Sequence, residues 1–190
     1  MFIQTEATPN PASLKFLPGR AVSGTVRDYT NADAARESPL ALALFEIAGV
    51  ERVFLGADFL TITKAEGTEW AHLKPPVLGV VMDHFVSNRP VLLEQAEDGH
   101  PSGEEAVYEG EAAEIVVQIK ELIETRIRPA VAQDGGDITF HSWDHAQGIV
   151  KLHLRGSCAG CPSSAFTLKQ GIETMLKHYV PEVSRVEPVL

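Results

Sequence analysis

The chain has 190 residues, of which 44% are hydrophobic and 22% are charged, a composition typical of globular proteins. No apolar run reaches the roughly 18 residues of a membrane-spanning helix, so we expect no membrane partner. The net charge of −10 and the absence of a basic half argue against nucleic-acid binding.

The first part of the chain, residues 1–93, alternates between strand-like and helix-like segments. Strands are predicted at 1–6, 13–17, 51–56 and 58–64, the last two forming a hairpin. Ser38 as N-cap and Pro39 at the first helical position predict a helix that ends at Gly49, and a second helix is predicted within 74–88. The order β-β-α-β-β-α indicates an α+β domain, an antiparallel sheet with two helices on one face.

Much of the negative charge lies in one segment. Between Glu94 and Glu111 there are seven acidic residues and no Lys or Arg, and without these seven the net charge would be −3 instead of −10. Such a composition cannot bury enough surface to offset its ordering entropy. We therefore expect residues 94–110 to be a flexible acidic linker between two small domains, residues 1–93 and residues 111–190.

The C-terminal domain is predicted to be a second α+β unit. An amphipathic helix covers about 111–128 and is ended or kinked by Pro129 and the sequence DGGD at 134–137. Two strands, 137–143 and 148–156, are joined by a turn at 144–147. A helix at 162–180 and an edge strand at 184–190 complete the order α-β-β-α-β.

Both cysteines of the chain lie in one short loop, GSCAGCPSS at 156–164. Cys158 is bracketed by Gly156 and Gly160, and Cys161 directly precedes Pro162 at the expected start of a helix. The partial positive charge of a helix N-terminus favours a thiolate. The small neighbours favour exposure, so both cysteines are expected to be reactive metal ligands.

The CxxC pair can be two buried small residues in a turn without a function, or it can belong to one of three kinds of site. A thiol-disulfide oxidoreductase of the thioredoxin type needs further elements, and only 29 residues (190 − 161) follow Cys161. A zinc site needs two more ligands, for which His141, His145 and His153 are the nearby candidates. A 4Fe–4S cluster needs four thiolates, which two chains with one CxxC each would supply.

The C-terminal half resembles the NifU-like domain in two stretches. These are IRPAVAQDGGDITF at 127–140 and GIVKLHLRGSCAGCPSSAFTLKQGIETMLKHYVPEV at 148–183. The N-terminal half resembles the N-terminal domain of the Nfu scaffold proteins. The resemblance lies in IQTEATPNPASLKFLPG at 3–19 and in VLGVVMDHF at 77–85.

This resemblance implies a non-enzymatic carrier for iron–sulfur cluster assembly. It places Cys158 and Cys161 on the cluster ligands of the family. The implied cofactor is a transient 4Fe–4S cluster that bridges two copies of the chain, and the implied partners are upstream assembly proteins and apo iron–sulfur proteins. No nucleophile–base pair or P-loop suggests an enzyme.

Other features of the sequence predict the cellular location of the protein and the role of its N-terminal domain. The first 16 residues lack the features of a secretory signal or an Arg-rich transit peptide, which predicts a bacterial cytoplasmic protein, or a mitochondrial matrix protein only if the chain is a processed one. The N-terminal domain has no cysteine. The resemblance suggests partner recognition, with Trp70 and His84 as candidate contacts, and a stabilising module is the alternative.

Overall fold

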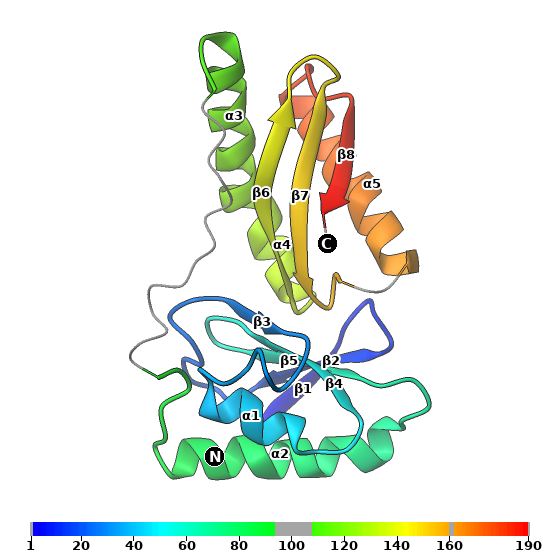
Figure 1. The fold of residues 1–190 in the computed structure, drawn as a ribbon. Coiled ribbons are helices and arrows are strands. Elements are labelled where there is room, and N and C mark those ends of the chain that lie inside the picture. Colours follow the sequence, from blue (N-terminus) through cyan, green and yellow to red (C-terminus); the bar gives the residue numbers. More distant parts are fainter. Residues whose placement is uncertain (1, 94–107, 160–161, 190) are drawn as a thin grey trace. The chain divides into compact units, whose positions relative to one another are not determined.

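The computed structural model describes residues 2–93, 108–159 and 162–189, without the side chains of 162–165. The chain divides into two compact units, Met1–Gly99 and His100–Leu190, each with its own sheet (Figure 1). Most of the predicted linker at 94–110 lies outside the described residues, so the linker and the boundaries drawn from it stay predictions. Within the described part, no helix combines the length and the apolar character needed to cross a membrane.

The N-terminal unit is an antiparallel five-stranded sheet of strand order β1-β2-β5-β4-β3. Its two helices lie on the same face of that sheet (Figure 1). This confirms the predicted α+β class. The elements in chain order are β1 Gln4–Ala7, β2 Ser13–Leu17, β3 Arg27–Tyr29, α1 Pro39–Phe45, β4 Val50–Leu55, β5 Leu60–Lys64 and α2 Trp70–Val86.

The helix starts and turns of this unit follow local sequence signals in part. The hydroxyl of Ser38 caps α1 by accepting a hydrogen bond from the Ala41 amide at 3.1 Å, as predicted. Helix α2 starts at Trp70, earlier than predicted, so Pro75 and Pro76 lie inside it. Their missing N–H groups would have bonded carbonyls of the exposed first turn, which water can reach, so the helix tolerates them.

The core of the N-terminal unit lies between the sheet and its two helices. Its most fully buried large side chains come from both layers and are Phe16, Leu40, Leu44, Leu55, Leu60, Ile62 and Leu73. Strand β3, which the sequence analysis did not predict, pairs with β4 at the sheet edge. It is only three residues long, too short to show an alternating pattern.

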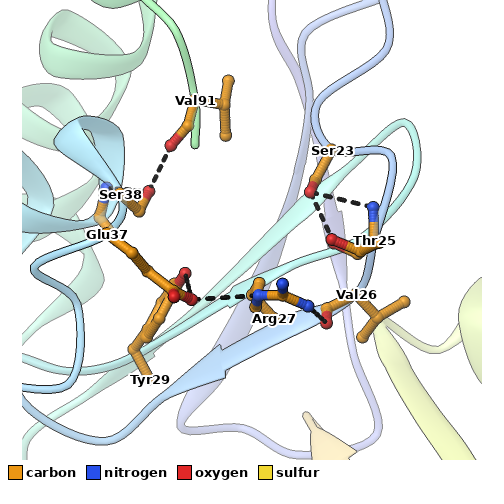
Figure 2. A network of polar contacts seen from close by, with 9 residues as sticks. Ser23, Thr25, Val26, Arg27, Tyr29, Glu37, Ser38 and Val91 are labelled. Carbon is orange, nitrogen blue, oxygen red and sulfur yellow. Dashed lines mark hydrogen bonds and ion pairs between the residues drawn. The ribbon is translucent and has the colours of Figure 1, made fainter. Parts of the chain in front are cut away.

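A polar network connects β3 to the segment that precedes α1 (Figure 2). One carboxylate oxygen of Glu37 accepts from Arg27 Nε at 3.0 Å and from the Tyr29 hydroxyl at 2.8 Å. Burial and then the Glu37 carboxylate raise the pKa of Tyr29, so this hydroxyl stays a donor. The Ser38 hydroxyl donates to the Val91 carbonyl at 2.7 Å. The network thereby attaches the end of the unit to its sheet.

The C-terminal unit is a three-stranded sheet of order β6-β7-β8, covered by helices on one face (Figure 1). Strands β6 and β7 are antiparallel, and β8 lies parallel to β7 as the predicted edge strand. This confirms the predicted element order. The elements are α3 Glu111–Leu122, the π-helical turn η2 Ile123–Ile127, α4 Arg128–Gln133, β6 Gly136–Asp144, β7 Ile149–Gly156, α5 Pro162–Tyr179 and β8 Arg185–Val189.

The first helix of this unit continues beyond its predicted end. Pro129 lies in the first turn of α4, and the helical path reaches Gln133. The wider π-helical turn η2 immediately before Pro129 provides the room that a proline ring needs against the preceding turn. The helix ends only at the DGGD sequence, where Gly135 adopts a positive φ of 80°.

Candidate functional site

The DGGD turn and the cysteine loop lie next to each other at one end of the β6–β7 pair. Gly136 begins β6, Gly156 ends β7, and the two are opposite each other in the strand register. Two motifs that are separated in the sequence are therefore adjacent in the fold. Antiparallel pairing alone produces this contact, because the start of one strand meets the end of the other.

Gly136 provides the space that the Cys158 sulfur occupies. A Cβ atom at position 136 would lie 2.6 Å from Cys158 Sγ and 2.8 Å from the Arg155 carbonyl oxygen. Real Cβ atoms do not approach other atoms this closely, and the Arg155 carbonyl belongs to the backbone of β7. Any larger residue at 136 must therefore displace the thiol, the strand or both.

Ser157 holds the cysteine loop on the turn. Its hydroxyl donates to the Asp134 carbonyl at 2.5 Å and lies 3.9 Å from Cys158 Sγ, and its amide donates to the Gly135 carbonyl at 3.3 Å. Gly156 adopts a positive φ of 66°, a conformation that favours glycine, and so lets the chain turn out of β7. The first half of the loop is thus fixed by backbone and hydroxyl hydrogen bonds.

The structure corrects the expected exposure of Cys158. Only 5% of the residue is exposed, and its side chain packs in the core of the C-terminal unit. Burial raises the pKa of the Cys158 thiol to about 11, against the lowering effect of the Ser157 hydrogen bond. The prediction of a thiolate was wrong for this conformation because it considered the small residues of the loop and not the turn that covers it.

Cys161, the second predicted ligand, lies outside the described residues. Helix α5 begins at the next residue, Pro162, as the sequence predicts. The pairing of the two cysteines as ligands therefore stays a prediction.

An ion-pair network that the sequence analysis missed supports the DGGD turn. Arg128 binds the buried carboxylate of Asp137 through Nε at 2.8 Å and Nη2 at 3.2 Å. Its Nη1 donates to both oxygens of Glu124 at 2.9 and 2.7 Å. The hydrogen bonding that Arg128 donates to Asp137 is the main cause of the raised pKa of Arg128. This network fixes the residue that follows Gly136 to the helix before the turn.

The candidate zinc ligands do not gather around Cys158 in the described structure. The rings of His141 and His153 meet across β6 and β7 with centroids 4.7 Å apart, and His145 lies beside Trp143 with centroids 6.3 Å apart. Among the described residues, no group of three or more His, Cys, Asp or Glu side chains could hold a metal ion. These residues therefore give the zinc alternative no support.

The candidate contact residues of the N-terminal unit have structural roles. His84 is only 2% exposed and packs edge-on against Phe85, so it cannot mark a contact surface. Trp70 is half-buried, and its Nε1 donates to the Pro11 carbonyl at 3.2 Å. This bond joins the start of α2 to the turn between β1 and β2.

Comparison with known proteins identifies both units. Residues 3–88 match the family of the scaffold protein Nfu/NifU N terminal, and residues 119–187 match the NifU-like domain. The NFU1 iron-sulfur cluster scaffold homolog, mitochondrial, of Drosophila sechellia is 51% identical over 100% of this chain and 65% of its own length. NifU-like protein 5, mitochondrial, of Arabidopsis thaliana is 51% identical over 98% of this chain and 67% of its own length.

A solved structure of a NifU-like protein from Saccharomyces cerevisiae is 29% identical, with a TM-score of 0.44 over 50% of this chain and 86% of that chain. The chain spans about two thirds of the length of the curated relatives it matches, 65% for the Drosophila sechellia protein. These relatives are named as mitochondrial proteins, which contradicts the predicted bacterial cytoplasmic location and points to the mitochondrion. The chain belongs to the Nfu/NifU-like family of iron–sulfur cluster scaffold proteins.

Proposed function

We propose that this protein carries a 4Fe–4S cluster, held by Cys158 and Cys161 of two chains, and delivers it to apo-proteins. The single observation behind this proposal is the contact between Gly136 and Cys158, which builds the two family motifs into one site. The cluster is cargo, and the proposed role of the chain is to hold it temporarily. The protein carries out no catalytic reaction of its own in this account.

The number of thiolate ligands that a 4Fe–4S cluster needs implies that two chains share it. A 4Fe–4S cluster is held by four thiolates, and each chain has two cysteines. A two-fold symmetric arrangement supplies one CxxC from each chain and leaves the cluster near the molecular surface. Such a cluster is accessible to the cysteines of an acceptor protein.

The burial of Cys158 adds a step to this account. Because Cys158 is only 5% exposed and its sulfur packs against Gly136, this sulfur cannot in the same position reach a cluster shared with a second chain. Loading therefore requires the loop to move Cys158 outward and the thiol to lose its proton, since only the thiolate binds iron. The hydrogen bonds of Ser157 to Asp134 and Gly135 are the described contacts that this movement must break.

The test is anaerobic reconstitution with ferrous iron and sulfide, followed by absorption spectra and iron analysis. We expect about four irons per two chains for the unchanged protein, and none bound for either Cys158→Ala or Cys161→Ala. Ser142→Ala, in the same unit, is the control that should load normally. A normal cluster spectrum in either cysteine variant would refute the proposal. A colourless protein that reduces disulfides would support the oxidoreductase alternative instead.

A further inference from the structure

Two histidine side chains meet on the open face of the C-terminal sheet. His141 comes from β6 and His153 from β7, and their ring centroids are 4.7 Å apart. Their neighbours Phe140 and Leu152 pack in the core, so the alternation of side chains sets both histidines on the opposite face. The helices of this unit cover only the core side of the sheet (Figure 1). His141 is exposed and His153 half-buried, and the proposed function uses neither.

An irregularity of β6 brings the two rings together. The register pairs Thr139 with His153 and then Ser142 with Lys151. His141 lies between these pairs as the extra residue of a β-bulge. A regular ladder would instead set His141 directly opposite Lys151, whose ammonium group repels cations. Bulges re-aim side chains and are frequent beside functional sites, and this one directs His141 towards the neighbouring imidazole.

The spacing of the two rings suits a shared metal ion. A histidine nitrogen lies about 2.0–2.1 Å from a bound zinc ion. Two imidazoles on one ion, with an angle of about 90–110° between their bonds to it, therefore have centroids about 4.5–5.2 Å apart. The observed 4.7 Å lies within that range. Because the ring planes meet at 69°, chelation needs a turn of the rings about their Cβ–Cγ bonds, a soft torsion, and no movement of the strands.

Each ring already has a hydrogen-bond partner. Nδ1 of His141 lies 3.0 Å from the Ser142 hydroxyl oxygen, and the ring of His153 hydrogen-bonds the backbone of Val189. Metal-binding histidines use their second nitrogen in this way, which orients the ring and leaves the other nitrogen for the ion. Burial, and then the electrostatic effect of His141 and Arg155, lowers the pKa of His153, which favours the neutral form that binds metals.

We propose that His141 and His153 together bind one divalent ion of a late transition metal, such as Ni²⁺ or Zn²⁺, with water in the remaining positions. Imidazole suits these ions, whereas Mg²⁺ and Ca²⁺ prefer oxygen ligands. Among the described residues, no third His, Cys, Asp or Glu side chain completes the ligand set, and the nearby Arg155 repels a cation. The site is therefore open and weak, with a dissociation constant of the order of 100 µM.

This histidine site is separate from the cysteine loop. The pair of Thr139 and His153 lies three residues along the β6–β7 ladder from the pair of Gly136 and Gly156, about 10 Å at the rise of a strand. Cys158 packs in the core, on the other side of the sheet. The histidines therefore cannot share an ion with the Cys158 thiol in this conformation, and the inference does not depend on cluster binding.

The test is a titration of the metal-free full chain with Ni²⁺ at about pH 7.5, followed by NMR of the histidine ring protons. Ni²⁺ is paramagnetic and broadens the resonances of the rings that bind it. The chain has seven histidines, whose ring resonances can be followed one by one. We expect the resonances of His141 and His153 to broaden together at the lowest Ni²⁺ concentrations, before those of any other ring.

Substitutions distinguish a chelate from two independent histidines. His141→Gln and His153→Gln should each weaken Ni²⁺ binding about tenfold or more, because the remaining ring loses the effective concentration of its neighbour. His145→Gln is the matched control, since His145 is an exposed histidine of the same hairpin, and it should leave binding unchanged. Arg155→Gln removes a like charge and should tighten binding about two- to threefold.

Broadening that is confined to His141 and His153, and that either substitution removes at low Ni²⁺, supports the proposal. Broadening of all exposed histidines at the same Ni²⁺ concentration would overturn it. An unchanged response of His153 in His141→Gln would overturn it as well, and so would the absence of broadening of both rings up to about 1 mM Ni²⁺.

Discussion

The two units belong to the same α+β class, yet they bury polar and reactive groups in different ways. The N-terminal unit has a partly buried ion pair and a buried tyrosine that hold its own segments together, and it contains no cysteine. The C-terminal unit instead packs the thiol of Cys158 into its core where two loops meet. The first network connects segments of one unit, whereas the buried thiol of the second unit must, under the proposed function, leave its position before a cluster is loaded.

Each unit also has glycines at which a side chain would collide with its surroundings, and Gly56 and Gly136 form one comparable pair. A Cβ atom at Gly56 would lie 2.6 Å from the ring of Phe59, and one at Gly136 would lie 2.6 Å from Cys158 Sγ. The Phe59 ring is a side chain that can shift, whereas Gly136 also faces the Arg155 backbone carbonyl at 2.8 Å. The same substitution therefore tests the two units under matched conditions.

We expect Gly136→Ala to have the largest effect. Overpacking of this kind costs about 1–3 kcal/mol of unfolding free energy, and the added methyl group must displace Cys158 or β7. Because loading requires Cys158 to leave this buried position, iron binding during reconstitution should be faster than in the unchanged protein, in a unit that retains its helical circular dichroism. Gly56→Ala should destabilise the N-terminal unit but leave iron binding unchanged. Equal rates of iron binding in the two variants would contradict this expectation.

The second effect concerns the buried network of the N-terminal unit. Arg27 is 7% exposed, and Glu37→Ala removes the carboxylate that both Arg27 and Tyr29 contact. We expect a loss of about 1–3 kcal/mol, measured by urea unfolding, below the full value for a buried pair because Glu37 is partly exposed. Asp33→Ala breaks the exposed ion pair with Arg36 and should cost about 0.5 kcal/mol or less. Similar costs for both would show that the network is not stabilising.

The smallest effect is a pH dependence that His84 gives the N-terminal unit. Burial, and then the nearby Arg89, lowers the pKa of His84, so its folded form resists protonation. Stability should be fully present above about pH 6.5 and should fall as the pH drops through the lowered pKa, by at most about 1.4 kcal/mol per pH unit. His84→Gln should remove this slope, and the exposed His72→Gln should not.

This dependence can be measured on one unit at a time. The chain has two tryptophans, Trp70 in the N-terminal unit and Trp143 in the C-terminal unit. In a Trp143→Phe background, fluorescence during urea unfolding reports on the N-terminal unit alone. An unchanged slope in His84→Gln would assign the pH dependence to another group.

Local patterns in the sequence predicted most elements of the fold. The capping of α1 by Ser38, the β4–β5 hairpin and the edge strand β8 all follow from neighbouring residues. The predicted helix ends were wrong where contacts between residues distant in the sequence outweigh a local preference. Prolines predicted the start of α2 and, with the DGGD sequence, an end or a kink after residue 128. Helix α2 instead begins at Trp70, before Pro75, and the helical path continues past Pro129, because tertiary packing outweighs these local penalties.

The site was predicted less completely than the fold. The resemblance to the NifU-like domain covered both Cys158 and the DGGD sequence, but it could not show that Gly136 lies against the sulfur. That contact depends on the register of β6 and β7, which is a long-range property. The Arg128–Asp137 bond was missed for the same reason, since an arginine in a helix and an aspartate at the start of a strand carry no local signal of pairing.

The most direct test of the central claim is the mass of the loaded protein under non-denaturing conditions. The account predicts a species of two chains with about four irons and four sulfides, which separates into metal-free chains when the cluster is chelated. It also predicts that a mixture of unchanged chains and Cys158→Ala chains forms no loaded mixed dimer. A single chain that retains a complete cluster, or a mixed dimer with four irons, would contradict it.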